Sequence, residues 1–189
     1  SKLPFEEIFI PLNLPETPAH LKEHSPSLLV PVLKMNGTLV WDSLAIIETL
    51  AELAPEAGIW PKDATARAVA RSVSAEMHSG FYRLRRDMPM DLRTDRAGTQ
   101  HTDGALDDAE KIIARWSDCR ERFGAGGPFL FGEWSAADIM YAPVVGRFRT
   151  YDVPVGGETR AYMDAVWAHP DMAEWAARAE EEPYEIAVL

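Results

Sequence analysis

One stretch of the sequence, residues 30–52 (VPVLKMNGTLVWDSLAIIETLAE), constrains the fold more than any other. Its first half holds two short apolar and β-branched runs, Val32 to Met35 and Thr38 to Trp41, separated by Asn36-Gly37. An Asn-Gly pair adopts the positive φ angles of a tight hairpin turn. From Leu44 onward, apolar residues recur at helical spacing up to Pro55. The stretch therefore predicts an antiparallel hairpin followed directly by a helix.

The segments on either side of this stretch differ in kind. Upstream, FEEIFI (residues 5–10) predicts a short strand, and Thr17 to about His24 predicts one or two helical turns. Downstream, PEAGIWPKD (residues 55–63) carries two prolines and a glycine, which favours a linker between two domains. The rest has helical periodicity, with helices expected at 64–88 (ended by Pro89), 105–123, from Ser135, 157–168 and 171–182. We predict an α/β domain at 1–56, a linker at 57–63 and an all-helical domain at 64–189.

Charge and composition argue against several kinds of partner. The 189-residue chain has a formal net charge of −11, which repels phosphate backbones, so we expect no nucleic-acid partner. No apolar run is long enough to cross a bilayer, so we expect no membrane partner either. The single cysteine, Cys119, cannot form an internal disulfide, which favours the cytoplasm, and its charged helical neighbours indicate a structural or surface thiol. His20 and His24 lack a nearby third ligand, so we expect no metal.

The dipeptide Val30-Pro31 precedes the first predicted strand of the hairpin and has two interpretations. Proline lacks an N–H group and fits poorly inside a sheet, so a trans proline would simply begin an edge strand. A cis bond, which X-Pro sequences tolerate, would instead turn the backbone N–H and C=O of Val30 outward. Those groups could then pair with an extended ligand as a neighbouring strand would.

Asp42-Ser43 lies where the second predicted strand meets the helix, and it also has two interpretations. Either residue can cap the helix by accepting a hydrogen bond from one of its free N–H groups. Alternatively, the helix start and the Ser43 hydroxyl could bind a ligand carboxylate while Asp42 faces an ammonium group. An α-amino acid head carries both charges on one carbon and would satisfy both residues.

The order strand, Val-Pro, strand, Asn-Gly, strand, Asp-Ser and helix resembles the glutathione-binding half of the glutathione transferase superfamily, a thioredoxin-like domain followed by a helical one. The resemblance implies that Val30, Pro31, Asp42 and Ser43 bind glutathione, with Val30 pairing to the backbone of its cysteine. Two positions depart from the family pattern. Leu28-Leu29 replace a common Gly-Lys, and Asp42 replaces a common Glu.

A second motif, FGEWSAADIMYAP (residues 131–143), is similar to the family's capping motif in the helical domain. Ser135 and Asp138 would form a capping box, and Trp134 and Ile139 a hydrophobic staple. We therefore expect Asp138 to act in folding and not in catalysis.

The family's sheet begins with a strand and a helix that precede the segment matched by FEEIFI, and the helix carries the activating residue. We therefore expect a β-α segment with an activating serine or cysteine upstream of Ser1. Ser1 itself would be only a linker residue, and we name no catalytic residue in the sequence given.

The resemblance implies a glutathione transferase-like enzyme in which glutathione attacks a small electrophile, or a glutathione-dependent isomerase, and a homodimer. The alternative is a non-catalytic relative that binds ligands or partners.

A possible second-substrate surface lies in the predicted helix at 64–88. At the spacing of one helix, His78, Phe81, Tyr82 and Arg85 would share a face. We take Phe81 and Arg85 as candidates for contact with an acidic second substrate. The competing interpretation is an aromatic core stripe flanked by solvated arginines.

Overall fold

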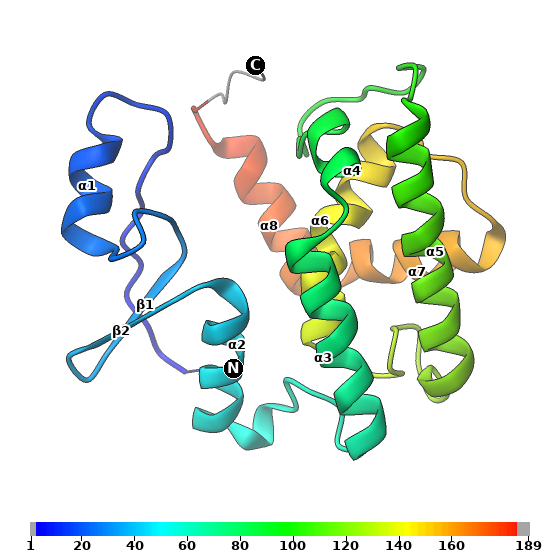
Figure 1. The fold of residues 1–189 in the computed structure, drawn as a ribbon, viewed down its shortest axis with the longest axis horizontal. Coiled ribbons are helices and arrows are strands. Elements are labelled where there is room, and N and C mark those ends of the chain that lie inside the picture. The colour runs from blue at the N-terminus through cyan, green and yellow to red at the C-terminus, as the bar shows by residue number, and fades with distance from the viewer. Residues whose placement is uncertain (1–2, 185–189) are drawn as a thin grey trace. The chain divides into compact units, whose positions relative to one another are not determined.

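The computed structural model describes residues 3–184 and divides into two compact units. The first unit comprises residues up to Ile59 together with Pro183 and Tyr184, and the second comprises Trp60–Glu182. The first is a mixed α/β unit and the second contains only helices and loops, apart from isolated bridges near Phe129 (Figure 1). The predicted order of an α/β unit followed by an all-helical one is confirmed. None of the helices in residues 3–184 combines the length and apolar character needed to cross a bilayer.

The first unit is built around a two-stranded antiparallel sheet. Its elements are α1 (Thr17–His24), β1 (Val32–Met35), β2 (Thr38–Trp41), α2 (Ser43–Leu53) and the short 3-10 helix η1 (Pro55–Ala57). The register pairs Val32 with Trp41 and Met35 with Thr38. Asn36 and Gly37 both have positive φ angles, 47° and 77°, as the hairpin turn requires. The predicted hairpin and the helix that follows it are confirmed.

The prediction of a strand at residues 5–10 is wrong. This segment has no regular secondary structure, and Phe5 is 83% and Phe9 58% exposed. Extended backbone becomes a strand only when another segment pairs with its N–H and C=O groups. Within residues 3–184 no segment pairs with this one, since the sheet holds β1 and β2 alone.

The second unit is a helical bundle around an aromatic core. Its helices are α3 (Ala64–Ser79), α4 (Tyr82–Asp87), α5 (Asp103–Phe123), α6 (Ala136–Thr150), α7 (Gly157–Ala168) and α8 (Pro170–Glu181). Trp116 of α5 is 1% exposed and touches three further aromatic rings. Those rings belong to Tyr141 and Phe148 of α6 and to Tyr162 of α7. Helices α5, α6 and α7 thus share one core.

The predicted single helix at 64–88 is wrong, because the chain breaks into α3 and α4 at Gly80-Phe81. Phe81 has a left-handed φ of 54°, and a Cβ on Gly80 would meet the Glu76 carbonyl oxygen at 2.6 Å. The start of α4 is stabilised by a residue that is far away in the sequence. Asp108 of α5 is buried and accepts hydrogen bonds from the backbone N–H groups of Arg83 and Leu84, both at 3.1 Å.

This break removes the face predicted for the second substrate. His78 belongs to α3, whereas Tyr82 and Arg85 belong to α4 and Phe81 is its N-cap. Phe81 is only 9% exposed and packs in the core, while Tyr82 is 71% exposed. The four residues therefore do not share one helix face.

The start of α6 confirms the predicted capping box. Asp138 is fully buried and accepts from the backbone N–H of Ser135 at 2.9 Å and from its hydroxyl at 3.0 Å. Its other oxygen accepts from the Leu130 N–H at 3.0 Å and from the Tyr162 hydroxyl at 3.3 Å. Asp138 therefore ties the loop before α6 to the start of α6 and to α7.

Candidate functional site

The loop that leads into β1 is shaped by a buried serine. Ser25 is 4% exposed, and its hydroxyl donates to the Leu29 carbonyl at 2.7 Å and accepts from the Leu29 N–H at 3.2 Å. Leu28 has a φ of 58°, and both leucines are more than half exposed. These contacts hold the chain in place just before Val30, so that the entry to β1 has a defined course.

Val30 lies just before β1, at the open end of the β1–β2 hairpin, and its backbone N–H and C=O groups are unpaired within the described residues. The Val30-Pro31 peptide bond is cis, and Val30 is 44% exposed. Among residues 3–184 neither the N–H nor the C=O of Val30 has a hydrogen-bond partner. The ladder with β2 begins only at Val32. Both backbone groups are therefore available to an extended ligand.

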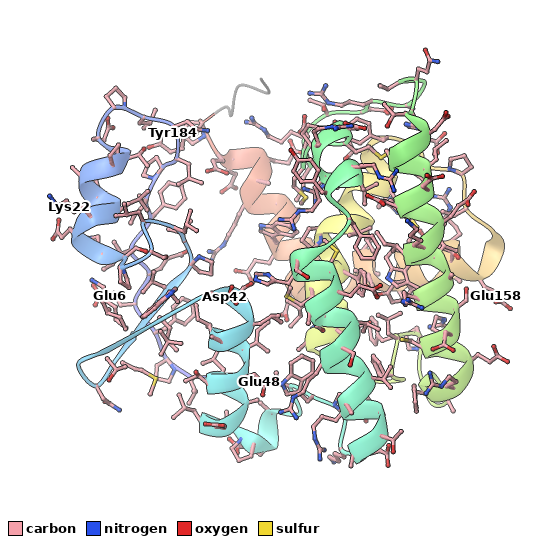
Figure 2. All side chains as sticks on the ribbon, viewed as in Figure 1. Glu6, Lys22, Asp42, Glu48, Glu158 and Tyr184 are labelled. Carbon is pink, nitrogen blue, oxygen red and sulfur yellow. The ribbon has the colours of Figure 1, made fainter. Side chains whose placement is uncertain are left out.

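Asp42 caps α2 in an uncommon backbone conformation. Its φ of 74° is positive, and its Oδ1 accepts from the Leu44 N–H at 2.9 Å. Asp42 is exposed and stands at the start of the helix, as its label in Figure 2 shows. The structural interpretation of Asp42 as an N-cap is thus confirmed. The carboxylate of Asp42 thus lies at the junction of β2 and α2.

Ser43 is the first residue of α2 and is half-buried. Within the described residues its hydroxyl has no hydrogen-bond partner, and the same holds for the backbone N–H groups of Ser43 and Ala45. The cap supplied by Asp42 satisfies only the N–H of Leu44. Free N–H groups and the helix dipole make this end of α2 attractive to an anion.

The two dipeptides adjoin the same end of the hairpin. The ladder ends with the pair Val32 and Trp41, so Val30-Pro31 directly precedes that end of β1 and Asp42-Ser43 directly follows that end of β2. The open backbone of Val30, the hydroxyl of Ser43 and the carboxylate of Asp42 therefore lie at the same end of the sheet. This end therefore presents open backbone groups, a hydroxyl and a helix start to a ligand.

The residue that would activate a bound thiol stays a prediction. The activating serine or cysteine is expected upstream of Ser1, and Ser1 itself, expected to be a linker residue, lies outside the described residues.

The candidates for the second substrate lie in the other unit. Arg85 is exposed on α4, and its Nη1 donates to the His78 carbonyl at 3.0 Å across the helix break. One charged residue near Arg85 was not predicted from the sequence. Arg147 of α6 is half-buried, and burial, followed by the charge of Arg85, lowers its pKa to about 10. A lone arginine within the apolar run YAPVVGRF was the signal in the sequence.

Neither the cysteine nor the histidines suggest an additional reactive centre. Cys119 is 1% exposed in the core of the second unit, and burial raises the pKa of its thiol to about 11. Such a thiol is inert at neutral pH. No group of three or more potential metal ligands occurs in the part of the chain that the structure describes.

Comparison with known proteins assigns each unit to the same family. The model for the glutathione S-transferase N-terminal domain matches residues 1–53, and the model for the C-terminal domain matches residues 99–178. Glutathione S-transferase L1 of Arabidopsis thaliana is 26% identical over 167 residues, which are 88% of this chain and 63% of that protein. A probable maleylacetoacetate isomerase of Caenorhabditis elegans is 41% identical over 69 residues, which are 36% of this chain and 32% of that protein. The chain thus spans less than two thirds of these relatives.

Solved structures have the same fold. A glutathione transferase homologue from Burkholderia, with bound glutathione, superposes with a TM-score of 0.71 at 23% identity and covers 96% of this chain and 86% of its own. Glutathione S-transferase 1-6 from Anopheles dirus gives a TM-score of 0.70 at 19% identity, with coverages of 92% and 82%. The predicted thioredoxin-like domain followed by a helical domain is confirmed. Because both family models match in the family's order, the chain belongs to the glutathione S-transferase superfamily.

Proposed function

We propose that this chain binds glutathione at the open end of the β1–β2 hairpin and promotes attack of its thiolate on a small electrophile. The observation that carries the proposal is that, among the described residues, the Val30 backbone and the Ser43 hydroxyl both lack a hydrogen-bond partner, and both adjoin the same end of the hairpin. Bound glutathione in the Burkholderia homologue supports it.

Each part of the tripeptide has a matching group at this end of the sheet. The backbone of its cysteine pairs with the N–H and C=O of Val30, beside Pro31. The carboxylate of its γ-glutamyl head accepts from the Ser43 hydroxyl and from the free N–H groups at the start of α2. The ammonium group of the same head faces the carboxylate of Asp42. Recognition thus combines strand pairing with both charges of one zwitterion.

The chemistry requires the thiolate of glutathione. A free thiol has a pKa of about 8.5, so a small fraction is ionised at neutral pH unless the protein stabilises the anion. The thiolate forms the new carbon–sulfur bond, and the electrophile loses its leaving group or accepts the electron pair. Among the described residues we assign none to thiol activation, and Cys119 is excluded by its burial.

Calorimetric titration of the chain with glutathione tests the assignment. Ser43→Ala removes a hydrogen bond to a charged group, so we expect the dissociation constant to rise roughly 10- to 100-fold. Ser72→Ala is the matched control, because Ser72 is an exposed helical serine of α3 that donates to the Ala68 carbonyl at 2.9 Å. Equal affinities for the wild type and the Ser43 variant would remove Ser43 from the site.

A glutathione-dependent isomerisation is the second candidate, favoured by the identity to the probable maleylacetoacetate isomerase. Conjugation consumes the free thiol of glutathione, whereas isomerisation returns it. Measuring the concentrations of free thiol and of electrophile during the reaction therefore distinguishes conjugation from isomerisation. Tight binding of glutathione without consumption of thiol or electrophile would indicate a non-catalytic relative. From the same family resemblance we propose that the protein is a cytoplasmic homodimer. Size-exclusion chromatography with light scattering measures its molar mass in solution and so tests the dimer.

A further inference from the structure

The two residues before Val30 form an exposed apolar pair. Leu28 is 54% exposed and Leu29 is 68% exposed. Leu28 also has a φ of 58°, in the left-handed region that favours glycine, and holding a leucine there costs free energy. The core of the first unit therefore gains little from either side chain, and the backbone at position 28 would form more easily with glycine.

The backbone N–H groups of this leucine pair are used inside the loop. The N–H of Leu28 donates to the Ser25 carbonyl at 3.3 Å, and the N–H of Leu29 donates to the Ser25 hydroxyl at 3.2 Å. Lys34 lies further along the chain in β1, and its Nζ is 2.7 Å from Nδ1 of His24. The leucine pair thus offers two apolar side chains to a ligand, and neither of its N–H groups is free to bind a carboxylate.

The pairing proposed for Val30 sets the direction of a bound peptide. When two residues exchange both N–H···O bonds, their strands run antiparallel. The γ-glutamyl head lies at Asp42-Ser43, which adjoins the end of the ladder, so a peptide whose cysteine pairs with Val30 continues towards Leu29. The C-terminal residue of the peptide therefore lies opposite Leu29, and Leu28 is the next residue along.

We propose that the leucine pair makes this site select a γ-glutamyl-cysteinyl peptide whose C-terminal group is uncharged and apolar. A free carboxylate at that place would lie against leucine side chains, which have no hydrogen-bond donor. An ester or an apolar residue would instead bury carbon against the same side chains. This preference rests on the glutathione site proposed above and specifies the class of thiol peptide that fits it best.

Calorimetric titration with glutathione and with its glycyl ethyl ester tests the preference. The two peptides share the γ-glutamyl head and the cysteine, and they differ only in the C-terminal group. We expect the ester to bind roughly fivefold more tightly, because its ethyl group is removed from water against the leucines.

Leu29→Lys should reverse this order by placing a cation opposite the C-terminal residue. Glutathione should then bind roughly fivefold more tightly than the ester, and added salt should narrow the difference. Leu53→Lys is the matched control and should keep the wild-type order. Leu53 is 47% exposed and ends α2, whereas Ser43 begins it.

Leu28→Gly serves as the second variant. Glycine adopts the left-handed conformation freely, so the melting temperature should not fall, while the advantage of the ester should shrink because one apolar side chain is lost. Circular dichroism reports whether each variant is folded.

Two results would overturn the preference while leaving glutathione binding intact. One is that the wild type binds glutathione as tightly as the ester or more tightly, and the other is that Leu29→Lys keeps the wild-type order. If neither peptide binds the wild type, the proposed glutathione site itself fails, and the preference fails with it.

Discussion

The strongest structural prediction concerns Asp138, whose carboxylate joins the loop before α6 to α6 and α7. Replacing it by asparagine keeps the size of the side chain but turns one acceptor oxygen into an NH2 group. Either the Ser135 or the Leu130 backbone N–H then faces another donor in place of its present partner at 2.9 Å or 3.0 Å. The hydroxyls of Ser135 and Tyr162 can rotate to adapt, but a backbone N–H cannot.

The expected loss of stability follows from the number of backbone N–H groups left without an acceptor. Leaving one buried donor unsatisfied costs about 1–3 kcal/mol, so Asp138→Asn should lower the free energy of unfolding by that amount. Asp138→Ala leaves both backbone donors without a partner and should cost roughly twice as much. Since a domain of this kind is stable by roughly 5–15 kcal/mol, the alanine variant could lose much of its stability.

The effect should also depend on pH. Burial raises the pKa of Asp138, although its hydrogen bonds to Leu130, Ser135 and Tyr162 oppose the shift. A carboxyl whose pKa is raised on folding contributes stability below its unfolded pKa, and that contribution is lost as pH rises through the folded pKa. The asparagine side chain does not titrate. The stability gap between the wild type and Asp138→Asn should therefore narrow as pH rises.

Urea unfolding followed by tryptophan fluorescence measures these differences. Asp118→Asn is the control, because Asp118 is a half-exposed acid on α5 and its change should stay within about 0.5 kcal/mol. If Asp138→Asn had the same urea midpoint as the wild type, the carboxylate would not be needed to satisfy the two backbone donors, and this reasoning would fail.

Three further predictions concern other parts of the chain. Burial raises the pKa of the Cys119 thiol to about 11, so at about pH 8 an alkylating reagent should label Cys119 only as fast as the protein unfolds. Mass spectrometry follows the labelling, and rapid labelling of the native protein would contradict the burial of Cys119. Gly80→Ala places a Cβ 2.6 Å from the Glu76 carbonyl oxygen and should cost about 1–3 kcal/mol in urea unfolding, whereas no loss would show that the α3–α4 break can shift. Asp42→Asn keeps the N-cap but removes the charge, so calorimetry should show weaker glutathione binding at nearly unchanged melting temperature; a large drop in melting temperature would show that the charge mainly supports α2.

Local sequence signals sufficed where structure is determined locally. Asn36-Gly37 fixes a turn that fits only a tight hairpin, and both strand ranges followed from it. The start of α6 was equally predictable, because Ser135 and Asp138 form a capping box within one turn.

The failures lie where distant residues decide the outcome. Residues 5–10 have strand-like composition, but a strand needs a neighbour that local sequence does not supply. The α3–α4 break depends on Asp108, which caps α4 from more than twenty positions along the chain. Arg147 is half-buried and forms no ion pair with a described carboxylate, and both features depend on the three-dimensional packing around α6.

We propose above that one end of the β1–β2 hairpin receives glutathione. Nitrogen–proton correlation spectra recorded during a glutathione titration test it residue by residue. We expect saturable chemical-shift changes in the backbone amides of Val30, Ser43 and Ala45, while the signal of the Cys119 amide does not move. If glutathione moved none of these three amides, or shifted only amides elsewhere in the chain, the assignment of the site would be contradicted.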